Sequence, residues 1–290
     1  MKHKLLKDIF NGESNTEIQW VFTVPAIWCD KGKQIMSKAA EMAGLSPDKF
    51  MLLEEPEAVL KYYSIKANEY PTKLPACYRC IVLQVGDNAI NSTIMKVEDD
   101  TYTMKTTIFS QYEGVIQEVS NFISDLFGTK VSKHCQKNHP LEYMTLFYSV
   151  KKEMKCVQPK TDIKICIPRV WFDIFEDLTT LSDAHMKSHL HQDVDCEGDE
   201  MKLKYELFWA FCDNFIQCRL QVIDHILATE SVAGIGVLFL AGDFIEPVFV
   251  DALKRQYPKH TILVARDPDK VILEGALMSW NEHFLHSSLK

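Results

Sequence analysis

Strand-like and helix-like patterns of apolar residues alternate along the first part of the chain. β-branched and aromatic residues over 18–24 predict a strand, and Pro25 ends it because proline cannot donate to a sheet. Apolar residues at helical spacing predict a helix from Asp30 to Gly44. We expect the side chain of Asp30 to cap this helix. Pro56 suits the first turn of a helix over 57–65, after a short strand over 51–53.

The same alternation continues beyond a proline-containing linker, which we place at 71–78. The amphipathic helix from Val115 to Gly128 and the continuous apolar strand over 237–241 are the clearest signals. The other predicted elements are strands over 79–85, 92–98, 101–109, 162–168 and 261–264, and helices near 147–155, 203–227, 251–256 and 270–286. Strands that alternate with helices predict the α/β class.

Composition narrows the kind of protein. The chain has 290 residues, of which 47 % are hydrophobic and 25 % charged, as in a folded protein, and this length favours two domains or subdomains over one. A net charge of −8 argues against nucleic acid and against an anionic membrane surface as partners. The nine scattered cysteines and the lack of an export signal or a long apolar run lead us to expect free thiols in the cytoplasm.

Three loops follow apolar strands and are candidates for a ligand site. They cover 83–91, 239–247 and 267–276, and ligands of α/β proteins bind at the carboxyl ends of strands. Gly86 and Gly242 have no side chain to keep a phosphate away from backbone amides. A single glycine after a strand is, however, more often part of an ordinary turn.

The order of several short motifs resembles the 70-kDa heat-shock proteins, most closely their atypical twelve-type members. The motifs are TVPA, AGL and EPEA within 17–63, the loop at 84–91, the lysines at 151 and 152, IxIxxP at 163–168, GDEMKL at 198–203, the loop around 242 and DPDKVILEGA at 267–276. The resemblance implies the actin-like ATPase fold, which is ribonuclease H-like. It assigns 1–70 to part of lobe I and 79–290 to a nearly complete lobe II, with a helical subdomain at about 112–228. The final helix, at about 270–286, would return to lobe I.

Departures from the family pattern lie in the phosphate loops. The Asp-Gly-Thr-Thr loop and the catalytic lysine that begin the family's domain have no counterpart before Glu17. In the second phosphate loop, Gln84 replaces the family's aspartate and Ala89 replaces its threonine. The family's three glycine positions are occupied here by Gly86, Asp87 and Asn88. In the adenosine loop, Asp243 replaces the family's second glycine. These changes imply a protein that does not hydrolyse ATP.

Other residues of the implied nucleotide site survive. The resemblance implies that Glu55 holds Mg²⁺ through water, that Lys151 and Lys152 flank the adenosine, and that Gly242 leaves room beside it. The remaining candidates are Gly86, Asn88, Phe244 and Asp269. The structural alternative makes Glu55 part of a helix cap, the lysines a solvated face, Gly242 a turn residue and Asp269 a cap.

The expected function is therefore a pseudo-ATPase that serves as a binding or regulatory module in a stress or immune response, with weak binding of ATP or ADP and Mg²⁺. The alternatives are a working chaperone-like ATPase and a partial gene product without an independent role. Apolar surface that faces the rest of lobe I predicts an unidentified protein partner or a homodimer.

Further clusters have metal-ligand chemistry. Cys77 and Cys80 are spaced as zinc ligands, and Cys135 with His134 and His139 would be needed to complete a site. His185, His189 and His191 lie in a polar stretch. Ordinary thiols and a solvated loop explain these clusters without a metal. No serine-nucleophile or complete phosphate-binding motif is present, so nucleophilic catalysis has no support.

Overall fold

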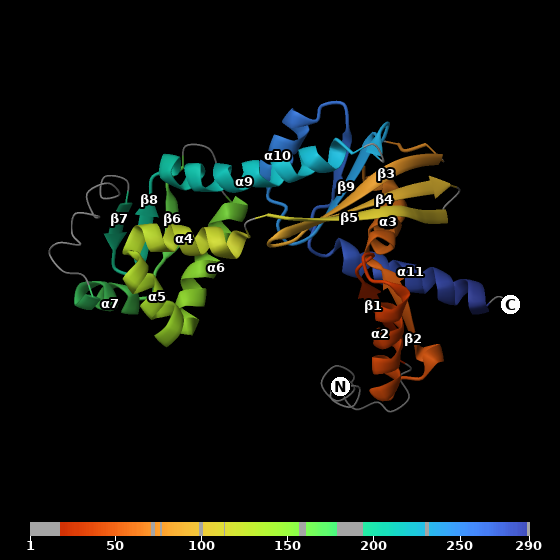
Figure 1. The fold of residues 1–290 in the computed structure, drawn as a ribbon, viewed down its shortest axis with the longest axis horizontal. Helices are drawn as coiled ribbons and strands as arrows, with labels where there is room; N and C mark the ends of the chain where they lie inside the picture. Colours follow the sequence, from red (N-terminus) through yellow and green to blue (C-terminus); the bar gives the residue numbers. More distant parts are fainter. Residues whose placement is uncertain are drawn as a thin grey trace. The chain divides into compact units, whose positions relative to one another are not determined.

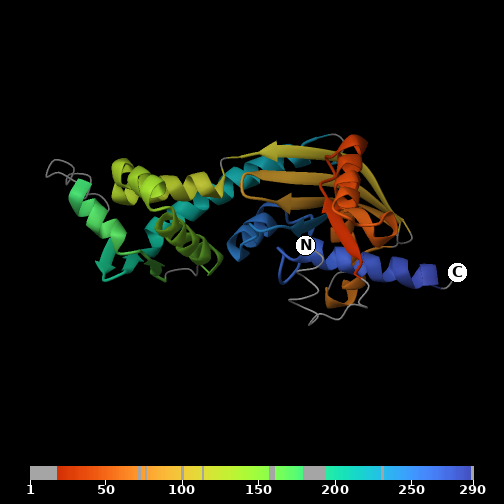
Figure 2. The ribbon, with the colours of Figure 1, turned by 90° about the horizontal axis from the view of Figure 1, so that it is seen from below.

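A computed structural model describes residues 18–70, 73–75, 77–98, 101–112, 114–156, 161–178, 194–229 and 232–288 (Figures 1 and 2). The chain forms two compact units, which are described separately. Unit 1 comprises 1–78, 97–103 and 270–290, and unit 2 comprises 79–96 and 104–269. The mixture of helices with parallel and antiparallel strands confirms the predicted α/β class.

Unit 1 is built on a two-stranded parallel sheet. Strand β1 (Trp20–Val24) pairs with β2 (Phe50–Glu54), so that Trp20 lies opposite Phe50. Helix α2 (Asp30–Met42) and the short turn η1 (Pro47–Lys49) connect the two strands. Helix α3 (Glu55–Ile65) follows β2 directly and ends before the turn η2 (Ala67–Glu69). The expected strands and helices are therefore present here, with slightly different ends.

The start of α2 differs from the prediction. Cys29, not Asp30, is the residue that precedes the helix, and it makes no side-chain capping bond. Asp30 lies in the first turn, where its negative charge suits the positive end of the helix dipole. The predicted end is observed, since Gly44 has a φ of +87°, which favours glycine.

Helix α11 (Val271–Ser288) belongs to unit 1 and packs against α3. A Cβ atom at Gly275 would lie 1.9 Å from the backbone oxygen of Ala58, so only glycine allows the two helices to approach this closely. Ala276 is buried at this contact with Ala58 and Leu53. This close contact groups α11 with α3 in unit 1, and the assignment of 79–290 to lobe II stays a prediction.

The main sheet has five strands in the order β10-β9-β3-β4-β5. Strand β9 (Val237–Ala241) lies between β10 (Thr261–Val264) and β3 (Cys77–Val85) and is parallel to both. Strands β4 (Ala89–Glu98) and β5 (Thr101–Gln111) complete the sheet. The carboxyl ends of the three parallel strands therefore meet at one edge.

Helices and a smaller sheet make up the rest of unit 2. The three-stranded antiparallel sheet has the order β6-β8-β7. Its strands are β6 (Ile163–Cys166), β7 (Val194–Glu197) and β8 (Glu200–Leu203), and the helices are α4 (Val115–Phe127), α5 (Thr129–Asn138), α6 (Pro140–Cys156), α7 (Val170–Leu178), α9 (Tyr205–Leu227) and α10 (Pro247–Gln256). Figure 1 shows α9 running from the small sheet to α10.

One continuous apolar core fills unit 2. It extends from Ile81 on β3, through Phe208 and Phe215 on α9, to Trp171 on α7. The eight cysteines whose side chains are described carry free thiols. Among the described helices, none is long and apolar enough to cross a membrane.

Candidate functional site

Three loops meet at the carboxyl edge of the parallel strands in unit 2. They follow β3, β9 and β10, and they are the loops that the sequence singled out. Gly242 joins them. Its φ is +127°, a Cβ atom on it would lie 2.2 Å from the backbone oxygen of Val85, and its amide donates to the oxygen of Pro268 at 2.9 Å. The fold itself therefore requires glycine at this position.

A cavity of about 410 Å³ opens beside Gly242. Its volume lies in the range of small-molecule sites. Gly242, Ile245 and Val250 line it from the segment that follows β9, and Lys155 lines it from α6. The charged residues of its lining are Lys155, Arg266, Asp243, Asp251, Asp267 and Asp269. Four carboxylates therefore face two cations, which makes the lining acidic.

The lysines at 151, 152 and 155 of α6 lie in different surroundings. The Lys151 ammonium lies 4.1 Å from the centre of the Phe244 ring, which is a cation–π contact. Lys152 is exposed and does not line the cavity. Lys155, which the sequence analysis missed, does line it. Its spacing of four residues from Lys151, one helical turn, is the signal that could have found it.

A buried ion pair holds the loop after β9. Arg219 on α9 is 1 % exposed and donates to Glu246 Oε2 at 2.8 Å and to the backbone oxygen of Phe244 at 2.6 Å. Its guanidinium also lies between the rings of Phe215 and Phe249, at 3.9 and 4.0 Å. Phe244 is itself 6 % exposed, so its ring belongs to the core of unit 2.

The turn between β3 and β4 is tied to its own surroundings. The Gly86 amide donates to the oxygen of Ala89 at 2.9 Å, and the Tyr112 hydroxyl donates to the oxygen of Gly86. Burial raises the pKa of Tyr112, so this hydroxyl keeps its proton. Asp87 Oδ1 accepts a hydrogen bond from the Ile116 amide at 3.1 Å. The turn thus has the conformation of a stable hairpin connection.

The remaining residues of the second phosphate loop differ in exposure. Gln84 is 7 % exposed and lies in β3 opposite Ala241, so its side chain is buried at the carboxyl end of this strand. Asn88 is exposed, and Ala89 begins β4. No side chain of this turn lines the cavity beside Gly242.

Glu55, the expected Mg²⁺ residue, lies in unit 1 as the first residue of α3. Pro56 follows it in the first turn, as expected. Glu54, the residue before Glu55, forms an ion pair with Lys33. The hydrogen bond between these two side chains raises the pKa of Lys33. Burial raises the pKa of Glu57 in the same turn.

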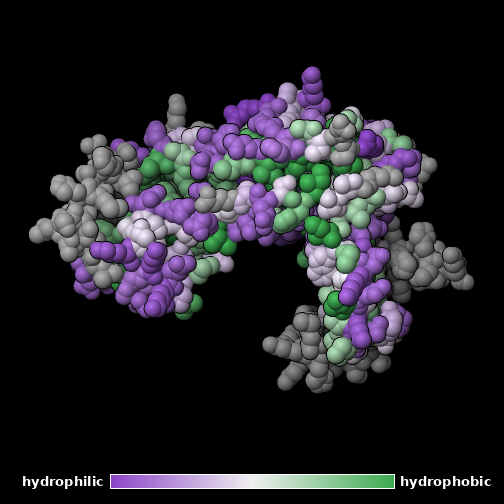
Figure 3. Space-filling view, viewed as in Figure 1, coloured by the Kyte–Doolittle hydropathy of each residue, from purple (hydrophilic) through white to green (hydrophobic). Residues whose placement is uncertain are grey.

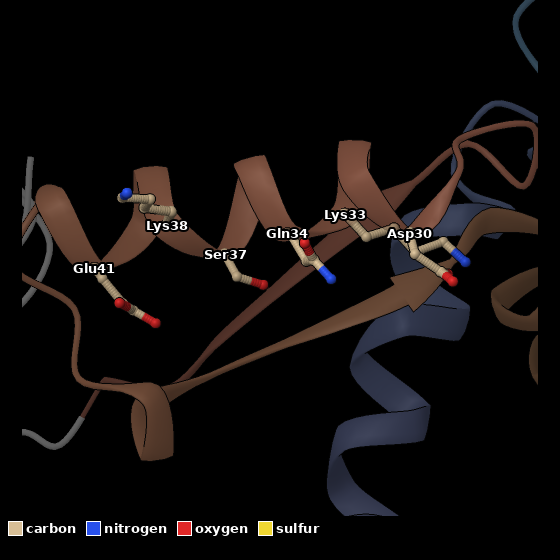
Figure 4. Close-up of a pocket in the computed structure, with 6 residues that line it drawn as sticks. All are labelled: Asp30, Lys33, Gln34, Ser37, Lys38 and Glu41. Carbon is tan, nitrogen blue, oxygen red and sulfur yellow. The ribbon is translucent and has the colours of Figure 1, made fainter.

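Helix α2 has two surface hollows on different sides. A polar hollow of about 540 Å³ is lined by α2 alone, and Figure 4 shows its six side chains, including Asp30 and Glu41, along the helix. An apolar hollow of about 490 Å³ includes Ile27, Trp28 and Ile35. Figure 3 shows hydrophobic surface beside hydrophilic surface along α2. One helix with mixed charges has no convergent chemistry, so the polar hollow is not a candidate active site.

The cysteine and histidine clusters carry no metal chemistry in the described part of the chain. No group of three or more potential metal ligands occurs there. Cys80 is buried and contacts the oxygen of Met95 at 3.8 Å, whereas Cys77 is exposed beside Glu98. His185, His189 and His191 lie outside the described residues.

Comparison with known proteins identifies relatives of the chain. No model of a known protein family matches it. Heat shock 70 kDa protein 12A from mouse and the protein of the same name from human are each 46 % identical to it over 327 residues of alignment, which cover 91 % of this chain and 48 % of the relative. The chain thus spans about half the length of these curated relatives. It is therefore related, through most of its length, to the twelve-type members of the 70-kDa heat-shock protein family.

Proposed function

We propose that unit 2 is lobe II of an actin-like nucleotide-binding domain and that residues 1–70 are part of lobe I. The cavity beside Gly242 would bind the adenosine part of ADP or ATP. The observation that carries this proposal is the convergence of Gly242, Asp269 and Lys155 on one cavity at the carboxyl ends of parallel strands. Lys151 and Phe244 contact each other but do not line the cavity, so Phe244 would act only through its chain neighbours Asp243 and Ile245, which do.

We further propose that the protein does not hydrolyse ATP. The neutral amide of Gln84 is buried in the sheet, and Ala89 has no hydroxyl for a phosphate or for the water around Mg²⁺. The chain would then act as a cytoplasmic binding or regulatory module in a stress or immune response. The alternative is a working ATPase of the same family, which release of phosphate would reveal.

Magnesium enters this proposal only with the nucleotide. A carboxylate such as Glu55, at the start of α3, suits hydrated Mg²⁺, which retains several waters and binds oxygen ligands. Mg²⁺ would supply charge neutralisation for the phosphates.

The direct test is calorimetric titration of the full chain with ADP and with ATP, each with Mg²⁺, followed by an assay for released phosphate. Lys155→Glu should weaken binding by about 10-fold, because it reverses a charge in the cavity lining. Lys152→Glu is the matched control on the same helix and should bind like the wild type. No heat and no thermal shift at millimolar nucleotide would contradict the proposal.

The apolar side of α2 supports a second proposal, that this surface binds another copy of the chain. Ile27, Trp28, Ile35 and Met42 are 53, 41, 62 and 82 % exposed. Large apolar side chains gathered on one surface are typical of protein contacts. Sedimentation equilibrium should show a dimer that Ile35→Glu dissociates and that Lys38→Glu, a change on the polar side of α2, leaves intact. A monomeric wild type at all concentrations would contradict it.

A further inference from the structure

The two glycine amides that a phosphate would need are already engaged. Phosphate-binding loops offer free backbone amides to the anion. Here the Gly242 amide donates to Pro268 and the Gly86 amide donates to Ala89, both at 2.9 Å. A phosphate at this edge would have to displace one hydrogen bond that joins the loops after β9 and β10 and one that closes the β3–β4 turn.

A third backbone amide near this edge, that of Ile116, already donates to a carboxylate of the protein. The Ile116 amide belongs to the first turn of α4, where a helix attracts anions, and it donates to Asp87 Oδ1 at 3.1 Å. Gly114 permits this contact, because a Cβ atom there would lie 2.9 Å from the Cβ of Asn88. The negative charge of Asp87 is therefore held in the β3–β4 turn.

This turn and the cavity lie at the same edge of the sheet. Gly242 packs on the backbone of Val85, and Gly86 and Asp87 follow directly in the chain. The carboxylate of Asp87 thus adds to an edge at which four carboxylates and two cations line the cavity. Each ligand phosphate would add negative charge to an acidic surface.

We infer that the cavity takes an uncharged nucleoside and discriminates against its phosphorylated forms. This inference rests on the proposed function, because it concerns the same adenosine site. Carboxylates such as Asp243 and Asp269 can accept hydrogen bonds from the hydroxyl groups of a ribose, whereas they repel a phosphate. Asp243 stands directly after Gly242 and lines the cavity, so it is the carboxylate chosen for the test.

The test compares adenosine, AMP, ADP and ATP as ligands of the full chain by calorimetry at low ionic strength, without and with Mg²⁺. Adenosine should bind at least about 10-fold more tightly than ATP without Mg²⁺, and the difference should shrink in high salt. Asp243→Asn should lower the ratio of adenosine affinity to ATP affinity by about 3-fold or more, since the variant removes a negative charge and keeps the size of the side chain.

Asp125→Asn is the matched control. Asp125 is an exposed carboxylate on α4 in the same unit and does not line the cavity, so its removal should leave the ratio unchanged. ATP binding as tight as adenosine binding, or an equal effect of both variants, would overturn the inference while leaving the nucleotide site in place. If none of the four ligands binds, the proposed function itself fails, and the inference fails with it.

Discussion

The two units bury their apolar residues very differently. Unit 2 has a continuous core that joins the five-stranded sheet, the small sheet and the long helix α9. Unit 1 has a two-stranded sheet, a largely buried helix α3 and a cluster around Leu53, Ala58 and Ala276. It also exposes large apolar side chains on α2. Two-stranded sheets are marginally stable alone, so unit 1 depends on the contact between α3 and α11 and gains from any surface that covers α2.

The difference also separates what each unit can do. In unit 2, a fully buried ion pair and two aromatic rings hold the loop after β9, which supplies part of the cavity lining. In unit 1, α2 alone forms the polar hollow, and α2 together with the residues just before it forms the apolar one. A preformed cavity favours small-molecule binding in unit 2, and the exposed apolar surface favours protein contact in unit 1.

Breaking the buried ion pair should have the largest effect. Arg219→Ala leaves Glu246 charged and buried, which should reduce the free energy of unfolding by about 3–5 kcal/mol. Chemical denaturation monitored by tryptophan fluorescence measures it. The double variant Arg219→Met with Glu246→Leu should recover most of the loss, since it leaves no unpaired charge. A single variant as stable as the wild type would show that unit 2 is not held by this pair.

The helix contact of unit 1 is the next target. Gly275→Val places methyl groups where Ala58 lies, and the overlap should cost about 3 kcal/mol or more within unit 1. Hydrogen exchange should accelerate in α3 and α11 and stay unchanged around Gly242. Leu277→Ala, at a side chain of the same helix that is 56 % exposed, is the control and should have little effect. Unchanged exchange in Gly275→Val would contradict the described packing.

Alkaline pH should weaken unit 2 through its buried thiols. Burial raises the pKa of Cys80 and of Cys212 from 9.0 to about 12, so both remain protonated in the folded protein while the unfolded chain ionises. The free energy of unfolding should therefore fall as the pH rises from about 9 toward 12, by up to about 1.4 kcal/mol per pH unit for each thiol. Denaturation at pH 8, 9 and 10 measures this slope, and Cys80→Ala with Cys212→Ala should make it shallower; the buried Cys135, whose pKa burial raises to about 11, accounts for part of what remains.

Thiol labelling gives the smallest effect, a difference in rate without a change in stability. Cys29 in unit 1 is exposed, whereas Cys80 and Cys212 in unit 2 are buried. At pH 8, iodoacetamide should label Cys29 much faster than the buried pair, because only the thiolate reacts and access is required. Equal rates in the folded protein would mean that the core of unit 2 opens readily.

The sequence predicted the regular framework and the loops of the candidate site, but not the contacts beneath them. Helix α4 and strand β9 were found because their apolar patterns are strong. Helix α5 was missed because most of its residues are polar, and α7 because it is short. The Arg219–Glu246 pair joins residues 27 apart, and the Asp87–Ile116 bond joins residues 29 apart, so no local pattern indicates either contact.

The most direct measurement of the central claim is hydrogen–deuterium exchange of the full chain with and without saturating adenosine. Ligand in the cavity should slow exchange in 242–251 and 265–269, at the carboxyl edge of the parallel strands, and leave α2 in unit 1 unchanged. With subsaturating ADP and Mg²⁺ in place of adenosine, Lys155→Glu should show weaker protection than the wild type, and Lys152→Glu should match the wild type. Absence of protection at both segments, or protection confined to unit 1, would contradict the account.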